Sequence, residues 1–327
     1  MSALLNLQNI KTYYYVRKGL FKTLTIKAVD DVSISIDRGK TVAIVGESGS
    51  GKTTLGKTAL KLVEPVSGRI IFEDKDITRL SGNDLKWFRR KAQMIFQDPF
   101  TSLNPYMTIK QIIEEPLIIH GFSEKEREER IIKALMDVRL YPPEEFILKY
   151  PHMLSGGQRQ RVGIARSLVL EPSFIVADEP VSMIDASSRA EILFLMRDLQ
   201  KKYAMGIMYI THDIATAKYF SDNIAIMYAG KIIEYGPSQV ILREPIHPYT
   251  VALMNAVPDP DPQNRFKMRR IVPGEPPNPI NPPSGCRFHP RCPYSDGQRC
   301  VKEEPQMRDF DDHRKVACHY AEQFIKR

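Results

Sequence analysis

Residues 46–53 have the sequence Gly-Glu-Ser-Gly-Ser-Gly-Lys-Thr, directly after the apolar run Thr41-Val42-Ala43-Ile44-Val45. The pattern is that of a phosphate loop, and it stands in the required context, after a predicted buried strand and at the start of a predicted helix. The glycines allow backbone amides to turn toward phosphate groups, and the helix N-terminus adds a partial positive charge. The stretch therefore predicts an α/β fold with a nucleotide-phosphate site.

The residues of this loop have distinct expected roles in binding ATP and Mg²⁺. Lys52 is expected to reach the β- and γ-phosphates, and Thr53 to ligate Mg²⁺. The residues that we expect to contact the nucleotide here are Ser48, Gly49, Ser50, Gly51, Lys52, Thr53 and Thr54.

A second apolar run ends in two carboxylates. Phe174-Ile175-Val176-Ala177 precedes Asp178 and Glu179. Asp178 stands where the predicted strand stops, so we expect it to hold Mg²⁺. The following Glu179 is not needed for binding, and its position suits a general base that activates the attacking water.

The rest of the pattern indicates a mainly parallel sheet covered by helices. Ile207-Met208-Tyr209-Ile210 predicts another buried strand, and each such run precedes a polar turn and a helix-like segment. Residues 123–138 predict a surface helix, because Ser123 and Glu126 fit a capping box and Ile131, Ile132 and Leu135 form an apolar stripe.

Composition limits the class of protein. The 327 residues are 43% hydrophobic and 26% charged, as in an ordinary globular protein. No stretch approaches a membrane-spanning helix, and the N-terminus lacks the features of a signal peptide, so we expect a cytosolic chain. The net charge of +8 does not favour nucleic acid, because basic clusters such as Arg269-Arg270 are short and scattered.

The segment Leu154-Ser155-Gly156-Gly157-Gln158 is the most specific motif. Its glycines precede a helical pattern, which predicts a second anion site, and a second site is useful if it faces the nucleotide of another subunit. Here the sequence resembles the ABC ATPase family, whose signature is this pentapeptide. The resemblance implies that Ser155, Gly156, Gly157 and Gln158 contact ATP bound by a partner subunit.

Other family motifs follow in order. Gln97 matches the Q-loop glutamine that touches Mg²⁺, and His212 matches the switch histidine that contacts the γ-phosphate. Ser182-Met183-Ile184-Asp185 matches the D-loop, although its two central residues depart from the usual Ser-Ala-Leu-Asp. In Tyr13-Tyr14-Tyr15, the register favours Tyr14 as the side chain on which adenine stacks.

The C-terminal part resembles one branch of the family. His247-Pro248-Tyr249-Thr250 and Pro273-Gly274-Glu275-Pro276-Pro277 occur in the order found in ATPase subunits of dipeptide, oligopeptide and nickel importers. Eleven of the 24 prolines lie between Pro258 and Pro293. We therefore predict a nucleotide-binding domain over 1–257, with N-terminal antiparallel strands and a helical subdomain over about 99–168, and a linker with a small cysteine-rich extension over 258–327.

The four cysteines of the chain all lie in this extension, at Cys286, Cys292, Cys300 and Cys318. Clustered cysteines in a cytosolic protein suggest a metal site. Tetrahedral thiolate ligation suits zinc and iron–sulfur equally, and the resemblance favours a [4Fe–4S] cluster over Zn²⁺. The histidines that could replace a ligand are His289, His313 and His319.

The resemblance implies a peripheral ATPase on the cytoplasmic face of the membrane that powers import of dipeptides or oligopeptides. Expected partners are a second ATPase subunit in a head-to-tail ATP-sandwich dimer, two transmembrane permeases and an extracellular solute-binding protein, but no nucleic acid. A nickel or other small-solute importer is the alternative. Two other classes fit less well. A soluble ABC protein usually carries two cassettes in one chain. A DNA-repair ATPase has a long coiled coil between its phosphate loop and its Mg²⁺ carboxylate, and no such segment separates Lys52 from Asp178 here.

Overall fold

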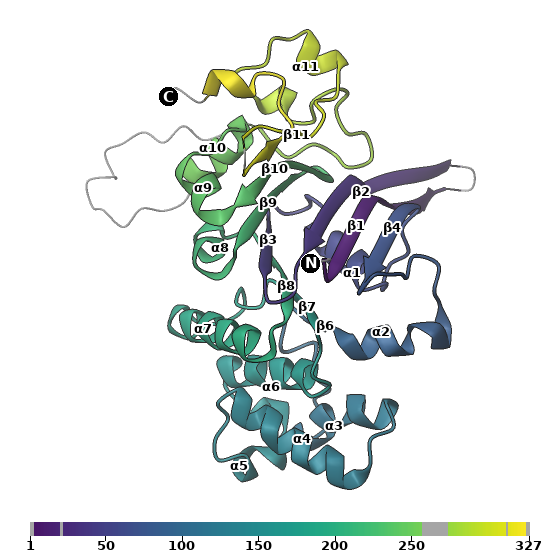
Figure 1. Cartoon of the computed structure of the whole chain (residues 1–327), viewed down its shortest axis with the longest axis vertical. Coiled ribbons are helices and arrows are strands. Elements are labelled where there is room, and N and C mark those ends of the chain that lie inside the picture. The colour runs from purple at the N-terminus through teal and green to yellow at the C-terminus, as the bar shows by residue number, and fades with distance from the viewer. Residues whose placement is uncertain (1–2, 20–21, 257–273, 312, 325–327) are drawn as a thin grey trace. The chain divides into compact units, whose positions relative to one another are not determined.

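The computed structural model describes residues 3–19, 22–256, 274–311 and 313–324 (Figure 1). The chain forms two compact units that are each discontinuous in sequence. The first unit comprises Met1–Leu5, Ile36–Thr41 and Phe72–Tyr209, and the second comprises Asn6–Ser35, Val42–Ile71 and Ile210–Arg327. The predicted mixed α/β architecture with an antiparallel sheet is confirmed.

The first unit has a core of strands in the order β8-β7-β6. β6 (Ala92–Ile95) and β7 (Phe174–Asp178) are parallel, with Ile95 opposite Ala177. All residues of β7 and of β8 (Gly206–Thr211) are buried, as the apolar runs predict, and the last two residues of β8 belong to the second unit. Other elements of this unit are β5 (Lys75–Asp76), η1 (Gly82–Leu85), α2 (Lys86–Lys91) and α7 (Ala186–Tyr203).

A group of helices fills the stretch between β6 and β7 and is drawn in teal in Figure 1. Within it α3, α4 and α6 pack against one another. Its members are α3 (Ile109–Ile119), α4 (Glu124–Asp137), α5 (Glu144–Ile147), η2 (Pro151–Met153) and α6 (Gly156–Leu168). These helices all lie inside the predicted helical subdomain.

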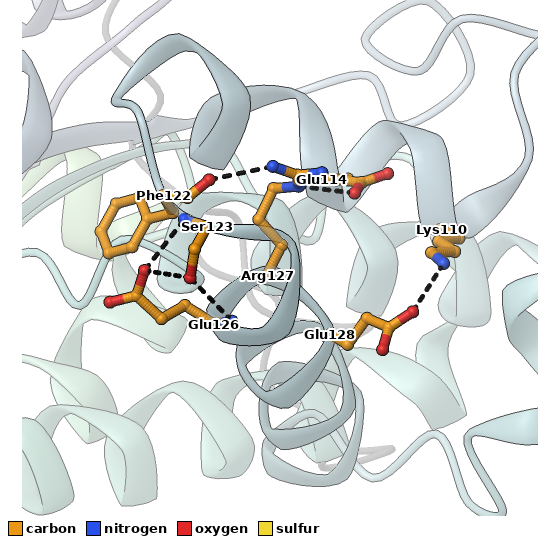
Figure 2. Close-up of polar contacts among 7 residues, drawn as sticks. All are labelled: Lys110, Glu114, Phe122, Ser123, Glu126, Arg127 and Glu128. Atoms are coloured by element: carbon orange, nitrogen blue, oxygen red, sulfur yellow. Dashed lines mark hydrogen bonds and ion pairs between the residues drawn. The ribbon is translucent and has the colours of Figure 1, made fainter.

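The predicted capping box is present at the start of α4 (Figure 2). The Ser123 amide donates to Glu126 Oε2 at 2.9 Å, and the Glu126 amide donates to Ser123 Oγ at 3.4 Å. Arg127 extends from the same turn to Glu114 on α3, with 2.8 Å between Nε and Oε1. Ile131 and Leu135 are buried, so the predicted apolar stripe faces the neighbouring helices.

The second unit contains strands from two sheets. One has the order β2-β1-β4, formed by β2 (Lys22–Ile36), β1 (Leu5–Lys18) and β4 (Ser67–Phe72). The other has the order β11-β12-β10-β9-β3, formed by β3 (Thr41–Val45), β9 (Asn223–Tyr228), β10 (Lys231–Pro237), β11 (Arg308–Asp309) and β12 (Lys315–Val316). β3 is parallel to β9, whereas β10 is antiparallel to both β9 and β12.

The helices of this unit are short. They are α1 (Lys52–Ala59), α8 (Ile214–Phe220), α9 (Ser238–Arg243), α10 (Pro248–Asn255), η4 (His289–Arg291), α11 (Arg299–Lys302) and η5 (Ala321–Phe324). Among the described residues, no helix is both long enough and apolar enough to span a membrane.

The cysteine-bearing extension shares the core and the sheet of the second unit. β12 pairs with β10, with Val316 opposite Glu234. Val316 and Ala321 pack with Ile246 in one buried cluster. The predicted boundary at residues 257 and 258 lies outside the described residues, as do Arg269-Arg270 and the first part of the predicted linker. That boundary stays a prediction.

Candidate nucleotide site and cysteine extension

The phosphate loop connects β3 to α1 in the second unit. β3 is fully buried and pairs with β9, which brings Gly46 against that strand. A Cβ added at Gly46 would lie 2.1 Å from the carbonyl oxygen of Met227, so only glycine fits. Gly51 caps α1 with φ 103°, in the region that favours glycine. The turn is thus set by close backbone contacts at both ends.

Lys52 lies along the loop. Its Nζ donates to the carbonyl oxygens of Gly46 and Glu47 at 2.8 and 2.9 Å, and the residue is only 6% exposed. Gly49 has φ 76°, and nothing lies within 4 Å of an added Cβ. The middle of the loop is therefore open, with a cationic group beside it, which suits a bound phosphate chain.

The three N-terminal tyrosines have different surroundings. Tyr13 donates its hydroxyl to Asp30 at 2.5 Å. Tyr14 donates to Thr54 Oγ1 at 3.5 Å, next to the phosphate loop, and Tyr15 is well exposed. Tyr14 is therefore the tyrosine nearest to the loop by its contacts. His212, also in this unit, is exposed after β8, and Asp213 beside it caps α8 by accepting from the Ala215 amide.

The carboxylates predicted for metal binding and catalysis lie in the first unit. Asp178 is the last residue of β7 and is 4% exposed. Glu179 follows with φ 45°, an unusual backbone for a residue other than glycine. Because β6 and β7 are parallel neighbours, Gln97 lies past the same end of the sheet, and its Nε2 donates to Glu179 Oε2 at 3.0 Å. The structure thus brings Gln97, predicted to touch Mg²⁺, into contact with Glu179, the predicted general base.

The signature segment opens α6 in the same unit. Ser155 is the N-cap, and it forms a capping box with Gln158, at 3.0 Å for the Ser155 amide and 3.3 Å for the Gln158 amide. Gly156 and Gly157 occupy the first turn, where a side chain would approach Ile184 and Ser188. Asp185 of the D-loop in turn caps α7, and hydrogen bonds from serine side chains and the Ser188 amide lower its pKa to about 2.

A phosphate loop in the second unit and an Asp-Glu pair at the end of β7 in the first define a phosphate-loop nucleotide-binding protein. Comparison with known families agrees. The family model described as "ABC transporter" matches residues 29–182. The family model described as "Oligopeptide/dipeptide transporter, C-terminal region" matches residues 233–300.

Known proteins resemble the chain over nearly its full length. The oligopeptide transport ATP-binding protein AppF of Bacillus subtilis is 44% identical over 321 residues, 97% of each chain. A probable peptide ABC transporter ATP-binding protein of Sinorhizobium fredii is 44% identical over 97% of this chain and 90% of that protein. The dimeric ATP-binding cassette MJ0796, solved with ADP and phosphate, is 31% identical with a TM-score of 0.63 and covers 72% of this chain and 98% of that chain.

The chain therefore belongs to the ABC transporter ATP-binding proteins, in the branch with the oligopeptide/dipeptide transporter C-terminal region. It is an ABC-type ATPase.

The four cysteines of the extension lie close to one another. The pKa of the Cys286 thiol is raised to about 12, mainly by burial, with smaller contributions from the other three thiols. Burial likewise raises the pKa of Cys318 to about 11. The Cys286 amide donates to the Cys300 carbonyl at 2.9 Å, which ties two of them together through the backbone. All four are free cysteines.

The predicted [4Fe–4S] cluster nevertheless has no support from the geometry. Over the described ranges, which include all four cysteines, no group of three or more His, Cys, Asp or Glu side chains is arranged to hold a metal ion. Two nearby histidines contact backbone instead, His289 at the Cys286 carbonyl and His319 at the Glu303 carbonyl, both at 2.9 Å. Neither iron–sulfur nor zinc ligation is supported by this arrangement.

Long-range contacts at and near the phosphate loop were not predicted from the sequence. Arg291 pairs with Glu47, and the Glu47 amide donates to the Tyr249 hydroxyl at 2.9 Å. Arg287 pairs with Asp30. The partners are more than 200 positions apart, so no local pattern could reveal them.

Proposed function

We propose that this chain is the ATPase subunit that powers import of dipeptides or oligopeptides through a membrane permease. The observation that carries the proposal is the extent of the similarity. It runs through the cassette and the C-terminal region alike, and a relative 44% identical over 97% of both chains is named an oligopeptide transport ATP-binding protein.

We propose the nucleotide contacts that the sequence motifs predict. The amides of Ser48–Thr54 and the ammonium group of Lys52 bind the phosphates, and Tyr14 stacks on adenine. The Thr53 hydroxyl and the Asp178 carboxylate have the oxygen ligands that Mg²⁺ prefers, with Gln97 as a further ligand. When bound, Mg²⁺ neutralises phosphate charge. Support comes from the position of Lys52 over the loop and of Asp178 at a strand end.

The proposed hydrolytic step uses water as the nucleophile. The water oxygen attacks the γ-phosphorus while Glu179 accepts a proton from that water. The bond between the γ-phosphorus and the oxygen that bridges it to the β-phosphate breaks, which leaves ADP and phosphate. Gln97 orients Glu179 through their hydrogen bond, and His212 contacts the γ-phosphate. The unusual backbone of Glu179 supports this role, because strained conformations concentrate at functional sites.

We propose that the subunit works as a head-to-tail pair with another ATPase subunit, against two permeases on the cytoplasmic face of the membrane, with an extracellular solute-binding protein supplying the peptide. The glycines of Ser155–Gln158 are then free to meet the nucleotide of the partner. The solved structure of MJ0796, which is a dimer with ADP and phosphate bound, supports such pairing.

A metal centre in the extension is a separate proposal. Cys286, Cys292, Cys300 and Cys318 ligate one [4Fe–4S] cluster with a structural role. Its support is the grouping of all four cysteines of the chain within this short segment of the sequence, and not the arrangement of their side chains. Anaerobically purified protein should contain about four irons per chain with broad absorbance near 400 nm. Stoichiometric zinc without iron would replace the cluster with a zinc site.

Transport in reconstituted vesicles tests the main proposal. The subunit is combined with its permeases, its partner ATPase and the solute-binding protein, and ATP-dependent uptake of labelled di- and tripeptides is compared with uptake of Ni²⁺. Peptide uptake that is lost in the Lys52→Ala variant is expected. Uptake of Ni²⁺ without peptide would reassign the substrate, and binding to ribosomes without permeases would remove the transport role.

A further inference from the structure

The C-terminal extension contacts the phosphate loop through one ion pair. Arg291 Nη1 lies 2.9 Å from Glu47 Oε2, and Nη2 lies 3.3 Å from Oε1. The Arg291 side chain is 9% exposed, and that of Glu47 is 29% exposed. Such a two-pronged contact fixes both groups more strictly than a single hydrogen bond. Glu47 is the second residue of the loop, directly after Gly46.

An apolar anchor aims Arg291 at the loop. Phe288, which is 1% exposed, packs edge-on against Tyr228 and Tyr249, with ring centroids 5.3 and 5.4 Å apart. The turn η4 then carries the chain to Arg291, whose Nη1 also donates to the Tyr228 hydroxyl at 3.3 Å. The position of the guanidinium group is thus determined by buried rings.

Glu47 is held at its backbone as well as at its side chain. Its amide donates to the Tyr249 hydroxyl at 2.9 Å, and Tyr249 is one of the two rings that receive Phe288. The extension therefore contacts Glu47 directly through Arg291 and indirectly through Tyr249.

The far end of the loop has a parallel support. The Gly230 amide donates to the Ser50 carbonyl at 2.8 Å. Arg287 of the extension donates to the carbonyl of the preceding Ala229 and pairs with Asp30, whose amide donates to the Gly230 carbonyl. The loop is held at both ends by structures that the extension supports.

Charge explains why Glu47 needs a partner. A phosphate loop binds a polyanion, and an unpaired carboxylate at its second position would repel that ligand. Arg291 neutralises the carboxylate and holds both of its oxygens on the side of the extension. A lysine could supply the charge but not the fork that engages both oxygens.

We propose that Arg291 is a positioning residue for nucleotide binding, which acts through Glu47 to hold the phosphate loop in its binding conformation and to remove the repulsion between that carboxylate and the nucleotide phosphates. The extension is then part of the nucleotide site and not a separable appendage. This inference rests on the proposed function, because it requires that the loop binds ATP.

The test measures binding of MgADP, which is not hydrolysed, to the full chain by calorimetry. Arg291→Ala is expected to weaken binding about tenfold, a typical loss when a hydrogen bond to a charged group is removed. Arg291→Lys should lose less. Arg299→Ala is the matched control, because Arg299 lies in the same extension and forms an exposed pair with Glu303; it should bind as the wild type does.

The Glu47→Gln background separates positioning from a merely structural role. With the carboxylate removed, Arg291→Ala should cause at most about a twofold further loss, because the partner that it neutralised is gone. The loss in Arg291→Ala alone should shrink as salt rises, since salt screens repulsion. If Arg291→Ala does not fold, as judged by circular dichroism, Arg291→Lys and Glu47→Gln carry the same comparison.

Two results would overturn the inference. One is MgADP binding by folded Arg291→Ala at wild-type affinity. The other is an equal loss from Arg291→Ala in the native and Glu47→Gln backgrounds, which would show that Arg291 does not act through Glu47. Failure of the wild-type chain to bind any nucleotide would instead refute the proposed function, so the two failures are distinguishable.

Discussion

The phosphate loop and the signature segment are both glycine-bearing turns that open a helix, but different interactions hold them. In the signature, Ser155 and Gln158 cap their own helix by a reciprocal pair of hydrogen bonds. In the phosphate loop, Gly51 is the N-cap of α1, and it has no side chain that could accept a hydrogen bond from the first turn of the helix. Its loop is held by Tyr249 and Arg291, which lie 202 and 244 positions from Glu47.

The difference shows that two glycine-bearing turns, both predicted to bind phosphates, can be held by different parts of a protein. The signature segment contains its own support and can keep its shape wherever its helix forms. The phosphate loop contacts distant residues, so we expect changes in the extension to affect it. Four experiments can break or sharpen this comparison.

The largest effect should come from Glu179→Gln, which leaves both loops intact. The amide keeps the shape of the carboxylate and can still accept from Gln97, but it cannot take a proton from water. ATP should bind normally while steady-state hydrolysis falls by about 10²- to 10⁴-fold. Near-normal ATP turnover by the pure variant would remove Glu179 from the role of general base. The phosphate loop or the signature segment would then have to contribute to hydrolysis as well as to binding.

Alanine at matched glycines should separate the loops by stability. In Gly46→Ala, the new Cβ meets the Met227 carbonyl at 2.1 Å, so the loop must shift, at a cost of about 3 kcal/mol or more. In Gly156→Ala, the nearest atom is Ile184 Cγ2 at 3.8 Å, an ordinary contact, and little change is expected. Urea unfolding measures both. Equal losses would contradict the view that only the phosphate loop is fixed by distant backbone.

The phosphate loop is also linked to a buried histidine. Burial lowers the pKa of His247 from 6.5 to about 3, and its Nδ1 accepts from the Tyr249 amide at 3.0 Å. Below pH 6.5 the unfolded chain takes up a proton that the folded chain refuses. The contribution of His247 to the free energy of unfolding is therefore complete above pH 6.5. It falls as the pH is lowered toward 3, by up to about 1.4 kcal/mol per pH unit.

His247→Asn is the comparison for this effect, because its side-chain oxygen can accept the same amide and does not titrate. The free energy of unfolding, measured with urea between pH 7 and pH 5, should fall less steeply with decreasing pH in the variant than in the wild type. Identical slopes would mean that His247 is not the group responsible.

The smallest effect should come from Ser155→Ala. It removes the N-cap of α6, which typically costs about 1 kcal/mol of stability. Binding of ATP to the monomer should not change, because the proposed role of Ser155 is toward the nucleotide of a partner. Calorimetry and urea unfolding of the same sample check both statements. Weakened ATP binding by the monomer would contradict that arrangement.

The sequence predicted the parts whose interactions are local. The capping box at Ser123, the buried strands around the phosphate loop and the order of the family motifs all lie within short windows, and periodicity or spacing reveals them. The contact of Arg291 with Glu47 depends instead on the folding of residues far apart in sequence. The sequence of the extension carries no phosphate-binding pattern, so its contact with the loop is visible only in the folded chain.

The anchor of the extension also limits how this segment could be transplanted. Two side chains of the extension, Phe288 and Arg291, contact the cassette. The ring of Phe288 packs against Tyr228 and Tyr249, and the guanidinium group of Arg291 pairs with Glu47. An ABC cassette used as a recipient would need two tyrosines and a carboxylate at the corresponding positions. Without them, the graft would bury an unpaired guanidinium group and leave an aromatic ring without a pocket.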